Sequence, residues 1–320
     1  MTTPSASPRE PTAPSSRVCV FGEALLDGMP TGPVPGGAPL NVAAHAAAFG
    51  LEPLLLTRLG VDDAGTALRA CLSAAGVPAE GVQEDARRPT GRAVVSQREG
   101  APRPEIPAGA AFDAIDGAVA ARAARAWKPS VVAFGTLAQR EPASRAALRE
   151  VLSATKAVCL VDLNLRAPWY DGYVVRKALA AADVVKVSDE ELAEIRRLLS
   201  LSVHDREALA VCVVRRFHLK ALYVTRGAKG AFVAAWTEGE VVSFGEASVS
   251  VPREVVVDTV GAGDAFTATV LLGLARGWSA AKSLRRGVDF AGAVTRIRGA
   301  VPADRDFYAP FLREWGSLAA

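Results

Sequence analysis

The sequence has few of the residues and patterns that mark several large classes of protein. It contains no apolar run as long as the roughly 18 residues that a membrane-spanning helix needs, so we predict no membrane partner. Its four cysteines form no Cys-x-x-Cys pair and its histidines number three, which leaves a zinc cluster without obvious ligands. Its 37 basic and 34 acidic residues give a formal net charge of +3, too balanced to indicate nucleic acid as a partner.

What the chain does have is enough apolar material for a large core. Half of its 320 residues are hydrophobic and 22% are charged, which is typical of a folded protein. Residues 1–16 are rich in Ser, Thr, Pro and Ala and lack the apolar core of a signal peptide, so we predict a disordered tail. Residues 17–320 contain no long linker and are expected to form one domain. Cys19, Cys159 and Cys212 lie in apolar runs, as reduced cysteines of a cytoplasmic protein do.

Short apolar runs alternate with longer segments of helical pattern along most of the chain. The runs predict strands at 17–21, 54–58, 131–134, 158–162, 184–187 and 222–225, and a β-hairpin at 231–236 and 240–244. The longer segments predict helices at 40–49, 64–75, 116–127, 141–155, 173–181, 190–199 and 206–217. Continuous Val, Ile and Leu runs separated by helices are typical of buried parallel strands. We therefore predict an α/β fold built as a three-layer helix–sheet–helix sandwich.

Two segments interrupt this alternation. Residues 27–37 are rich in Gly and Pro, and residues 90–98 alternate like an exposed strand before a further Pro-rich stretch. We predict that the parts near 28–36 and 89–107 form a small β lid over a site.

The strongest indication of chemistry is a glycine-rich turn late in the chain. A predicted strand at 255–257 leads into Gly261, Ala262 and Gly263 and then into a helix that begins near Asp264. Glycines let the backbone approach a ligand closely, and the free N–H groups and dipole at a helix start favour an anion such as phosphate. A carboxylate at such a place suits a base that takes a proton from an attacking hydroxyl.

Two other interpretations of this turn can be weighed on the sequence. Asp264 also fits a plain helix N-cap, which the spacing alone does not distinguish from a base. The dinucleotide pattern G-x-G-x-x-G is broken, because Phe266 stands where its third glycine belongs, and G-x-x-x-x-G-K-[ST] is absent from the chain. Neither a Rossmann dinucleotide site nor a Walker A loop is therefore supported.

The turn and five further elements resemble those of the ribokinase-like (PfkB) carbohydrate kinases, in the family's order. These elements lie at 36–43, 58–65, 162–166 with Trp169, 186–191, 224–231 and 258–266. Weaker patterns at 89–92 and 105–107 resemble the fructokinase branch. The resemblance spans residues from about 18 to 302 and implies the ribokinase-like sandwich with its β lid.

The resemblance implies a role for each matching residue of the catalytic turn and the sugar pocket. Asp264 is implied as the catalytic base, with Gly261, Ala262 and Gly263 holding the transferred phosphoryl group. The residues implied to bind the sugar are Asp27, Gly36, Gly37, Asn41 and Arg166. Asp27 also fits a loop acid, the two glycines a simple turn, Asn41 a polar residue of a first helical turn, and Arg166 a structural ion pair.

The resemblance also implies ATP and Mg²⁺ as the cofactors. The residues implied to bind the nucleotide are Ser188, Thr225, Gly227 and Gly230, and Ser188 replaces the asparagine usual in its element. Glu191 is implied to hold Mg²⁺ through water, although an acid at a helix start is also favoured by the dipole. Asp258 and residues 296–301 match a region that holds a monovalent cation such as K⁺ in some members.

The function implied is transfer of the ATP γ-phosphate to a hydroxymethyl oxygen of a sugar, with fructose as the first expectation. Other acceptors stay open, namely 2-keto-3-deoxygluconate, ribose, tagatose phosphate or a nucleoside. So does a non-catalytic sugar or nucleotide sensor on the same fold. An exposed edge at 90–98 also suggests a homodimer that pairs through the lid.

Overall fold

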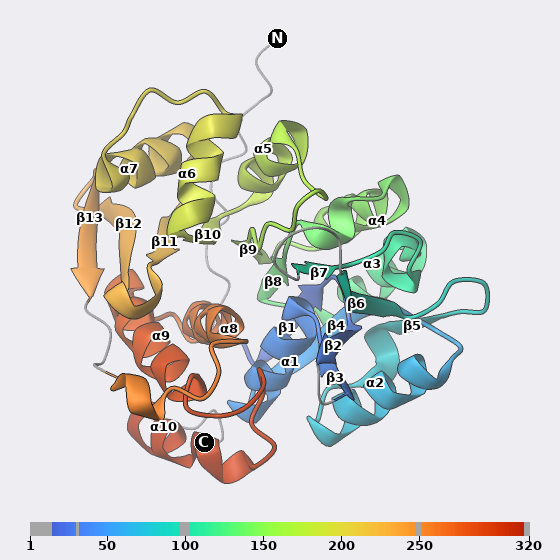
Figure 1. Ribbon diagram of the computed structural model, residues 1–320. Coiled ribbons are helices and arrows are strands. Elements are labelled where there is room, and N and C mark those ends of the chain that lie inside the picture. Colours follow the sequence, from blue (N-terminus) through green and yellow to red (C-terminus); the bar gives the residue numbers. More distant parts are fainter. Residues whose placement is uncertain (1–14, 30–31, 97–102, 247–250, 317–320) are drawn as a thin grey trace.

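A computed structural model describes residues 15–29, 32–96, 103–246 and 251–316, so that the predicted tail at 1–16 lies almost wholly outside them. The main sheet has nine strands in the order β13-β12-β11-β10-β9-β8-β1-β4-β5 (Figure 1). The strands are β1 Arg17–Phe21, β4 Glu52–Gly60, β5 Val82–Asp85, β8 Val131–Phe134, β9 Val158–Asp162, β10 Val184–Ser188, β11 Ala221–Thr225, β12 Ala231–Thr237 and β13 Glu240–Glu246. From β11 to β5 the pairs are parallel, whereas β12 and β13 form an antiparallel hairpin.

Helices cover both faces of this sheet. One face carries α3 Gly117–Trp127, α4 Pro142–Ala154, α5 Gly172–Ala181, α6 Asp189–Leu198 and α7 Arg206–Phe217. The other carries α1 Ala38–Ala48, α2 Asp63–Ala74, α8 Ala262–Ala275, α9 Ala280–Val294 and α10 Ala309–Trp315. Successive strand residues enter opposite cores, so Cys19 and Phe21 pack on the first face while Val18 and Val20 pack on the second. The predicted α/β sandwich is confirmed.

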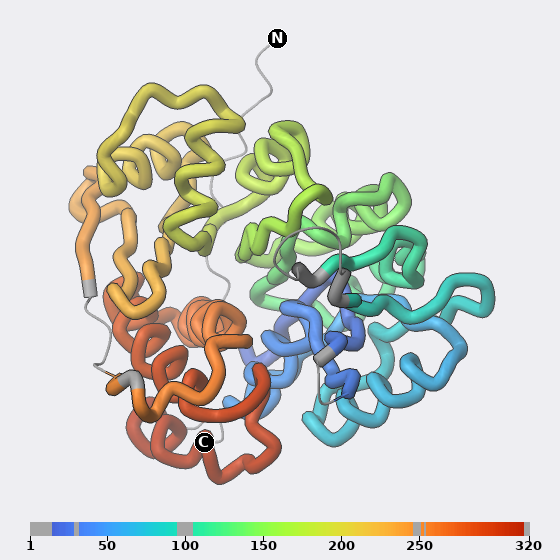
Figure 2. The backbone as a smooth tube through the Cα atoms, in the orientation of Figure 1, coloured from blue at the N-terminus to red at the C-terminus, as the bar shows by residue number. Residues whose placement is uncertain are grey.

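A second, four-stranded sheet lies in front of the first, in the order β3-β2-β6-β7. Its strands are β2 Leu25–Met29, β3 Gly32–Gly36, β6 Gly91–Ser96 and β7 Arg103–Glu105. Figure 2 shows that its two halves, far apart in sequence, lie side by side, and β2 pairs in parallel with β6. We call this second sheet the lid. Residues 97 and 98 of the strand predicted at 90–98 lie outside the described residues.

The start of β6 is fixed to the main sheet by Asp62 and Thr90. Asp62 caps α2 by accepting from the Gly65 N–H at 2.7 Å, and its carboxylate also accepts from the N–H and the hydroxyl of Thr90. The buried Thr90 hydroxyl in turn accepts from the Gly60 N–H at 2.9 Å. These contacts give the predicted element at 58–65 a structural role, because they set where the lid strand leaves the domain.

Replacing Thr90 by valine is expected to lower the free energy of unfolding by about 1–3 kcal/mol, because it leaves the buried Gly60 N–H without an acceptor. Chemical denaturation measures this change. Thr66→Val is the matched control, since the Thr66 hydroxyl is exposed and donates only to a backbone carbonyl. Equal losses in the two variants would show that the Thr90 contacts contribute nothing of their own.

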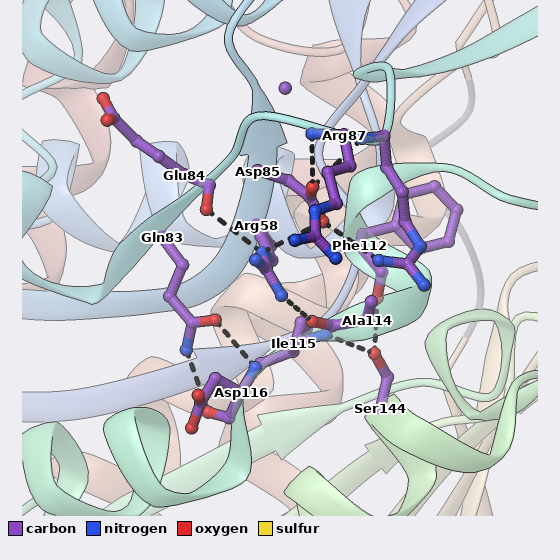
Figure 3. Close-up of polar contacts among 12 residues, drawn as sticks. Arg58, Gln83, Glu84, Asp85, Arg87, Phe112, Ala114, Ile115, Asp116 and Ser144 are labelled. Atoms are coloured by element: carbon purple, nitrogen blue, oxygen red, sulfur yellow. Dashed lines mark hydrogen bonds and ion pairs between the residues drawn. The ribbon is translucent and has the colours of Figure 1, made fainter.

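A second polar cluster holds β4 and β5 together at the edge of the main sheet (Figure 3). Arg58 of β4 lies 3.3 Å from the Asp85 carboxylate and donates to the Glu84 and Ala114 carbonyls. Buried Asp85 also accepts from the Arg87 N–H at 2.9 Å. Arg58 and Asp85 therefore join β4, β5 and the 3₁₀ turn Ala111–Ala114 at this edge of the main sheet.

The structure corrects one predicted strand and adds several elements. Residues 255–257 do not form a strand: Arg253–Val255 is a 3₁₀ turn, and Val255, Val256 and Val257 are 42%, 37% and 58% exposed. The β-branched run lacks the neighbouring strand that such a pattern normally packs against. The sequence patterns predicted no bounds for β5, α9 or α10, whereas β2 and β3 lie in or beside the segment near 28–36 that was predicted to contribute to a β lid.

Among the described residues, every helix is too short or too polar to cross a membrane. All four cysteines are free; Cys19 and Cys159 are buried, whereas Cys71 and Cys212 are partly exposed.

Candidate active site

The glycine-rich turn lies where the carboxyl ends of the central strands meet the start of α8. Gly261 precedes the helix with φ of 80°, a left-handed conformation that favours glycine. A side chain there would collide with the backbone of Ala300. The N–H groups of Gly263 and Asp264 belong to the first helical turn and have no preceding helical carbonyl to donate to, whereas the Ala262 N–H makes a long hydrogen bond of 3.4 Å to the Thr259 carbonyl. The turn therefore presents an anion-binding edge.

Asp264 is the third residue of α8 and does not cap the helix, which excludes the N-cap interpretation. Its Oδ2 accepts a hydrogen bond of 2.7 Å from Nδ2 of Asn41 in the first turn of α1. Burial raises the pKa of Asp264 to about 6, with the Asn41 hydrogen bond acting in the opposite direction. Asp264 thus has the pKa of a base that is ionised at neutral pH and still accepts a proton readily.

A buried ion pair lies directly beneath this turn. Lys186 of β10 contacts both carboxylate oxygens of Asp162 of β9 at 3.2 Å, and Thr267 of α8 donates to the same carboxylate at 2.7 Å. A side chain at Gly263 would place its Cβ 3.1 Å from the Lys186 ammonium. Burial lowers the pKa of Lys186, but Asp162, Glu191 and Asp264 outweigh it and raise the value overall. A permanent positive charge therefore lies beside the anion-binding turn.

Ser188 and Glu191 form a reciprocal cap at the start of α6. The Ser188 hydroxyl accepts from the Glu191 N–H, and Glu191 accepts from the N–H groups of Ser188 at 2.8 Å and Leu165 at 2.6 Å. Burial raises the pKa of Glu191, opposed chiefly by Lys186. No group of three or more His, Cys, Asp or Glu side chains suited to a metal occurs within the described ranges. Glu191 joins the start of α6 to the segment after β9, with both of its carboxylate oxygens accepting backbone hydrogen bonds.

The residues predicted for the sugar pocket gather between the lid and α1. Asp27 of β2 fills the space that a side chain at Gly36 of β3 would need, so glycine is required there. Gly37, with φ of 100°, precedes α1, and its carbonyl accepts from the Asn41 N–H. Burial raises the pKa of Asp27, and the positive charge of exposed Arg166 opposes it. Arg166 also lowers the pKa of Asp264, so its charge acts on both the lid carboxylate and the catalytic turn.

The residues predicted for the nucleotide lie in a loop after β11. Thr225 ends this strand and donates its hydroxyl to the Val187 carbonyl of β10 at 3.3 Å. Gly227 and Gly230 have φ of 55° and 82°, and Arg226 N–H closes the loop on the Gly230 carbonyl at 2.7 Å. Among the contacts of the described residues, none joins this loop directly to Asp264 or Asn41. The structure therefore has two groups of predicted residues, one at the lid and one at β11.

Three residues near the site were not among the predicted ligands. Lys186 and Asp162 occur inside the recognised elements, but only the sheet order shows that they form a pair. His45 of α1 is buried, with Nδ1 at 2.8 Å from the Tyr308 hydroxyl and Nε2 at 3.0 Å from the Ala300 carbonyl. It thereby holds the segment that packs against Gly261, and burial lowers its pKa to about 4, so it stays neutral.

Residues 14–305 match the model of the pfkB family of carbohydrate kinases. The chain belongs to this family. It is 30% identical over 295 residues to a fructokinase of Escherichia coli, which covers 87% of this chain and 91% of that protein.

Solved structures of kinases share this fold. The structure of a fructokinase from Xylella fastidiosa with bound ATP gives a TM-score of 0.77 at 24% identity, covering 94% of this chain and 99% of that one. Aminoimidazole riboside kinase from Salmonella enterica, complexed with its riboside and an ATP analog, gives 0.74 at 23% identity, covering 92% and 99%. The pfkB fold therefore accommodates different acceptors.

Proposed function

We propose that this pfkB family member transfers the ATP γ-phosphate to a hydroxymethyl oxygen of a sugar, with fructose as the first acceptor to test. The observation that carries the proposal is the contact of Asn41 with Asp264 at the start of α8. It puts a base of raised pKa, a fixed amide and an anion-binding turn in one place. The resemblance to fructokinases at about 30% identity supports fructose.

Each part of the site has a step in the proposed reaction. Asp264 takes the proton of the sugar hydroxyl, whose oxygen then forms a bond to the γ-phosphorus as the bond to ADP breaks. Asn41 holds the Asp264 carboxylate in place through its 2.7 Å hydrogen bond. The N–H groups at Ala262 and Gly263 and the Lys186 charge stabilise the negative charge that builds on the transferred group.

The remaining predicted roles follow from the same arrangement. Asp27, Gly36, Gly37 and Arg166 bind the sugar under the lid, and Ser188, Thr225, Gly227 and Gly230 bind ATP. Both Glu191 oxygens accept backbone hydrogen bonds, which fits a Mg²⁺ held through water and by ATP rather than by direct ligation. When bound, Mg²⁺ would neutralise phosphate charge. Asp258 accepts from the Gly299 N–H at 3.1 Å, which places it at the loop proposed for K⁺.

The proposed dimer is constrained by the edges of the lid. The edge predicted at 90–98 is not free, because β6 lies between β2 and β7; among the described residues the edge strands are β3, with prolines at 33 and 35, and β7, with a proline at 104. A partner that adds a strand to the lid would therefore pair with β3 or β7 and not with β6, and proline removes N–H groups from the pairing at either edge.

An ADP-release assay with Mg·ATP and a panel of sugars, sugar acids, sugar phosphates and nucleosides tests the proposal. We expect turnover with fructose. Turnover with another acceptor alone would keep the kinase chemistry and remove the fructose assignment. ATP or sugar binding without turnover on any acceptor would favour the sensor interpretation and overturn the proposed reaction.

A further inference from the structure

Glu23 is a buried carboxyl to which the proposed reaction assigns no role. It lies in the turn directly after β1 and is 4% exposed. Its Oε2 is fully buried and accepts a hydrogen bond from no described residue. Asn41, 5% exposed, has the same feature, because its Nδ2 is used on Asp264 while its Oδ1 has no donor.

Two buried acceptors without donors in one site call for an explanation. Folded proteins pair nearly all of their buried polar groups, since an unpaired one loses its hydrogen bonds to water without replacement. Both groups here are acceptors, so the partner that they lack is a donor. A polyhydroxylated molecule supplies such donors, whereas a phosphate or a carboxylate does not.

The position of Glu23 is on the acceptor side of the site. Glu23 lines a cavity between the carboxyl ends of β1, β8 and β9 together with Asp162, Asn164 and Thr267. Its backbone carbonyl lies 2.7 Å from the Cβ that a side chain at Gly37 would have, so the Glu23 turn packs against the predicted sugar loop.

Charged groups of the proposed site also act on Glu23. Arg166 and Asp264, which flank the proposed sugar pocket, both act on its ionisation, as does Arg140. Within the described residues the cavity is lined neither by the nucleotide loop after β11 nor by Asn41 or Asp264; its link to the predicted sugar pocket is α1, which contributes Ala38, Pro39 and Val42 to the lining.

We propose that Glu23 is a specificity-determining residue of the proposed kinase: its carboxylate accepts a hydrogen bond from a sugar hydroxyl that is not phosphorylated. The inference rests on the proposed function and deepens it. Sugars that carry a hydroxyl at that point complete the pairing of Glu23, and sugars that lack it leave the buried oxygen unpaired. Specificity of this kind is strong, because a sugar that lacks the hydroxyl binds only at the free-energy cost of leaving a buried carboxylate oxygen without a hydrogen bond.

The chemistry of the carboxyl sets the conditions of the test. Burial raises the pKa of Glu23 to about 7, while a hydrogen bond from its own backbone N–H acts in the opposite direction. At pH 8 the group is mainly a carboxylate and only accepts. In Glu23→Gln the amide oxygen takes over the bond to the backbone N–H, so an NH₂ group replaces Oε2 and cannot accept.

The experiment compares native protein and Glu23→Gln at pH 8, using the best acceptor of the panel and its monodeoxy analogues. Glu23→Gln is expected to lower kcat/KM for the parent sugar roughly 10- to 100-fold, the usual range for a hydrogen bond to a charged group. One analogue, which lacks the hydroxyl that Glu23 contacts, is expected to lower the kcat/KM of the native protein by a similar factor. With the variant, kcat/KM for that analogue is expected to be little lower than for the parent sugar, because the two changes remove the same contact.

The control and the opposite outcomes are defined by the same series. Glu80→Gln, at an exposed glutamate, is expected to leave all rates unchanged. If each deoxy analogue lowers kcat/KM by the same factor in the variant as in the native protein, Glu23 contacts no sugar hydroxyl. Its missing donor is then a buried water, and the inference is wrong. If Glu23→Gln does not fold, Glu23→Asp takes its place, because its carboxylate is one methylene further from the sugar. The same test applies, namely whether the losses in kcat/KM from the variant and from the analogue add.

Failure of the inference differs from failure of the proposed function. Absence of turnover by the native protein on every acceptor overturns both. Normal turnover by the native protein with additive losses overturns the role of Glu23 alone.

Discussion

Replacing Asp264 by asparagine is expected to lower kcat by about 10²–10⁴-fold, the range for loss of a positioned general base. Asparagine keeps the size of the side chain, so the fold and the α8 turn should remain. The ADP-release assay with a saturating acceptor measures the loss. Asp63→Asn is the matched control, since Asp63 also lies in a first helical turn but is exposed on α2. Near-native turnover in folded Asp264→Asn would show that another group takes the proton.

The same substitution has a second consequence, of opposite sign, for stability. The pKa of Asp264 is raised from 3.8 to about 6 in the folded state, so the ionised carboxylate is less favourable there than in the unfolded chain. This cost is absent below the unfolded pKa, grows as the pH rises toward 6 and is complete above it. Asp264→Asn is therefore expected to be more stable than the native protein by about 1–3 kcal/mol at pH 8.

Denaturation at pH 8 and near pH 4 checks this prediction, because the gain should vanish at the lower pH. The activity of the native protein should follow the same group: kcat/KM is expected to fall about tenfold per unit below pH 6. A stability gain that does not depend on pH would contradict the raised pKa.

Replacing Gly261 by alanine is expected to have the second largest effect. The left-handed backbone costs an alanine roughly 1–2 kcal/mol, and the new Cβ collides with Ala300, which His45 holds in place. The turn must move, and its N–H groups then lose their alignment toward the phosphoryl group. Loss of one such donor typically lowers kcat by about 10²–10³-fold, and the same assay measures it.

Gly277 provides the matched control for this change. It also has a left-handed backbone, with φ of 68° against 80° at Gly261, but no atom lies within 4 Å of its added Cβ. Gly277→Ala should therefore lose similar backbone stability and keep its kcat. A similar fall of kcat in both variants would mean that backbone strain, and not the geometry of the turn, lowers the rate.

The main sheet was predictable from the sequence because its central strands are buried on both faces. Strands such as Val131–Phe134 and Val158–Asp162 are apolar at nearly every position, and the sequence predicts both with the bounds that the structure has. Helix bounds differ by a residue or two, as at α1, predicted at 40–49. The segment near 28–36 was predicted to belong to a β lid, but the separate bounds of β2 and β3 were not predicted because their prolines and glycines are typical of turns. The run at 255–257 has strand-forming residues but no strand beside it.

The sequence predicted those site residues that lie in a recognisable local pattern, but not the contacts between them. Asp264 and its glycines form a recognisable pattern, and Asn41 follows another glycine pair. That these two residues touch depends on the packing of α1 against α8, which spacing alone does not give. The unpaired oxygen of Glu23 was beyond prediction for a related reason, since a missing partner is visible only when all neighbours are placed.

The contact between Asn41 and Asp264 spans 223 residues of the chain, and that between His45 and Tyr308 spans 263. A ribosome that has completed the lid and α1 must therefore still make α8, α9 and α10 before the site exists. Until then Phe49 of the first part lacks Phe290, Tyr308 and Trp315, the rings that enclose it in the finished protein. The growing chain thus exposes this apolar face throughout most of its synthesis, and that is the interval in which chaperones have something to bind.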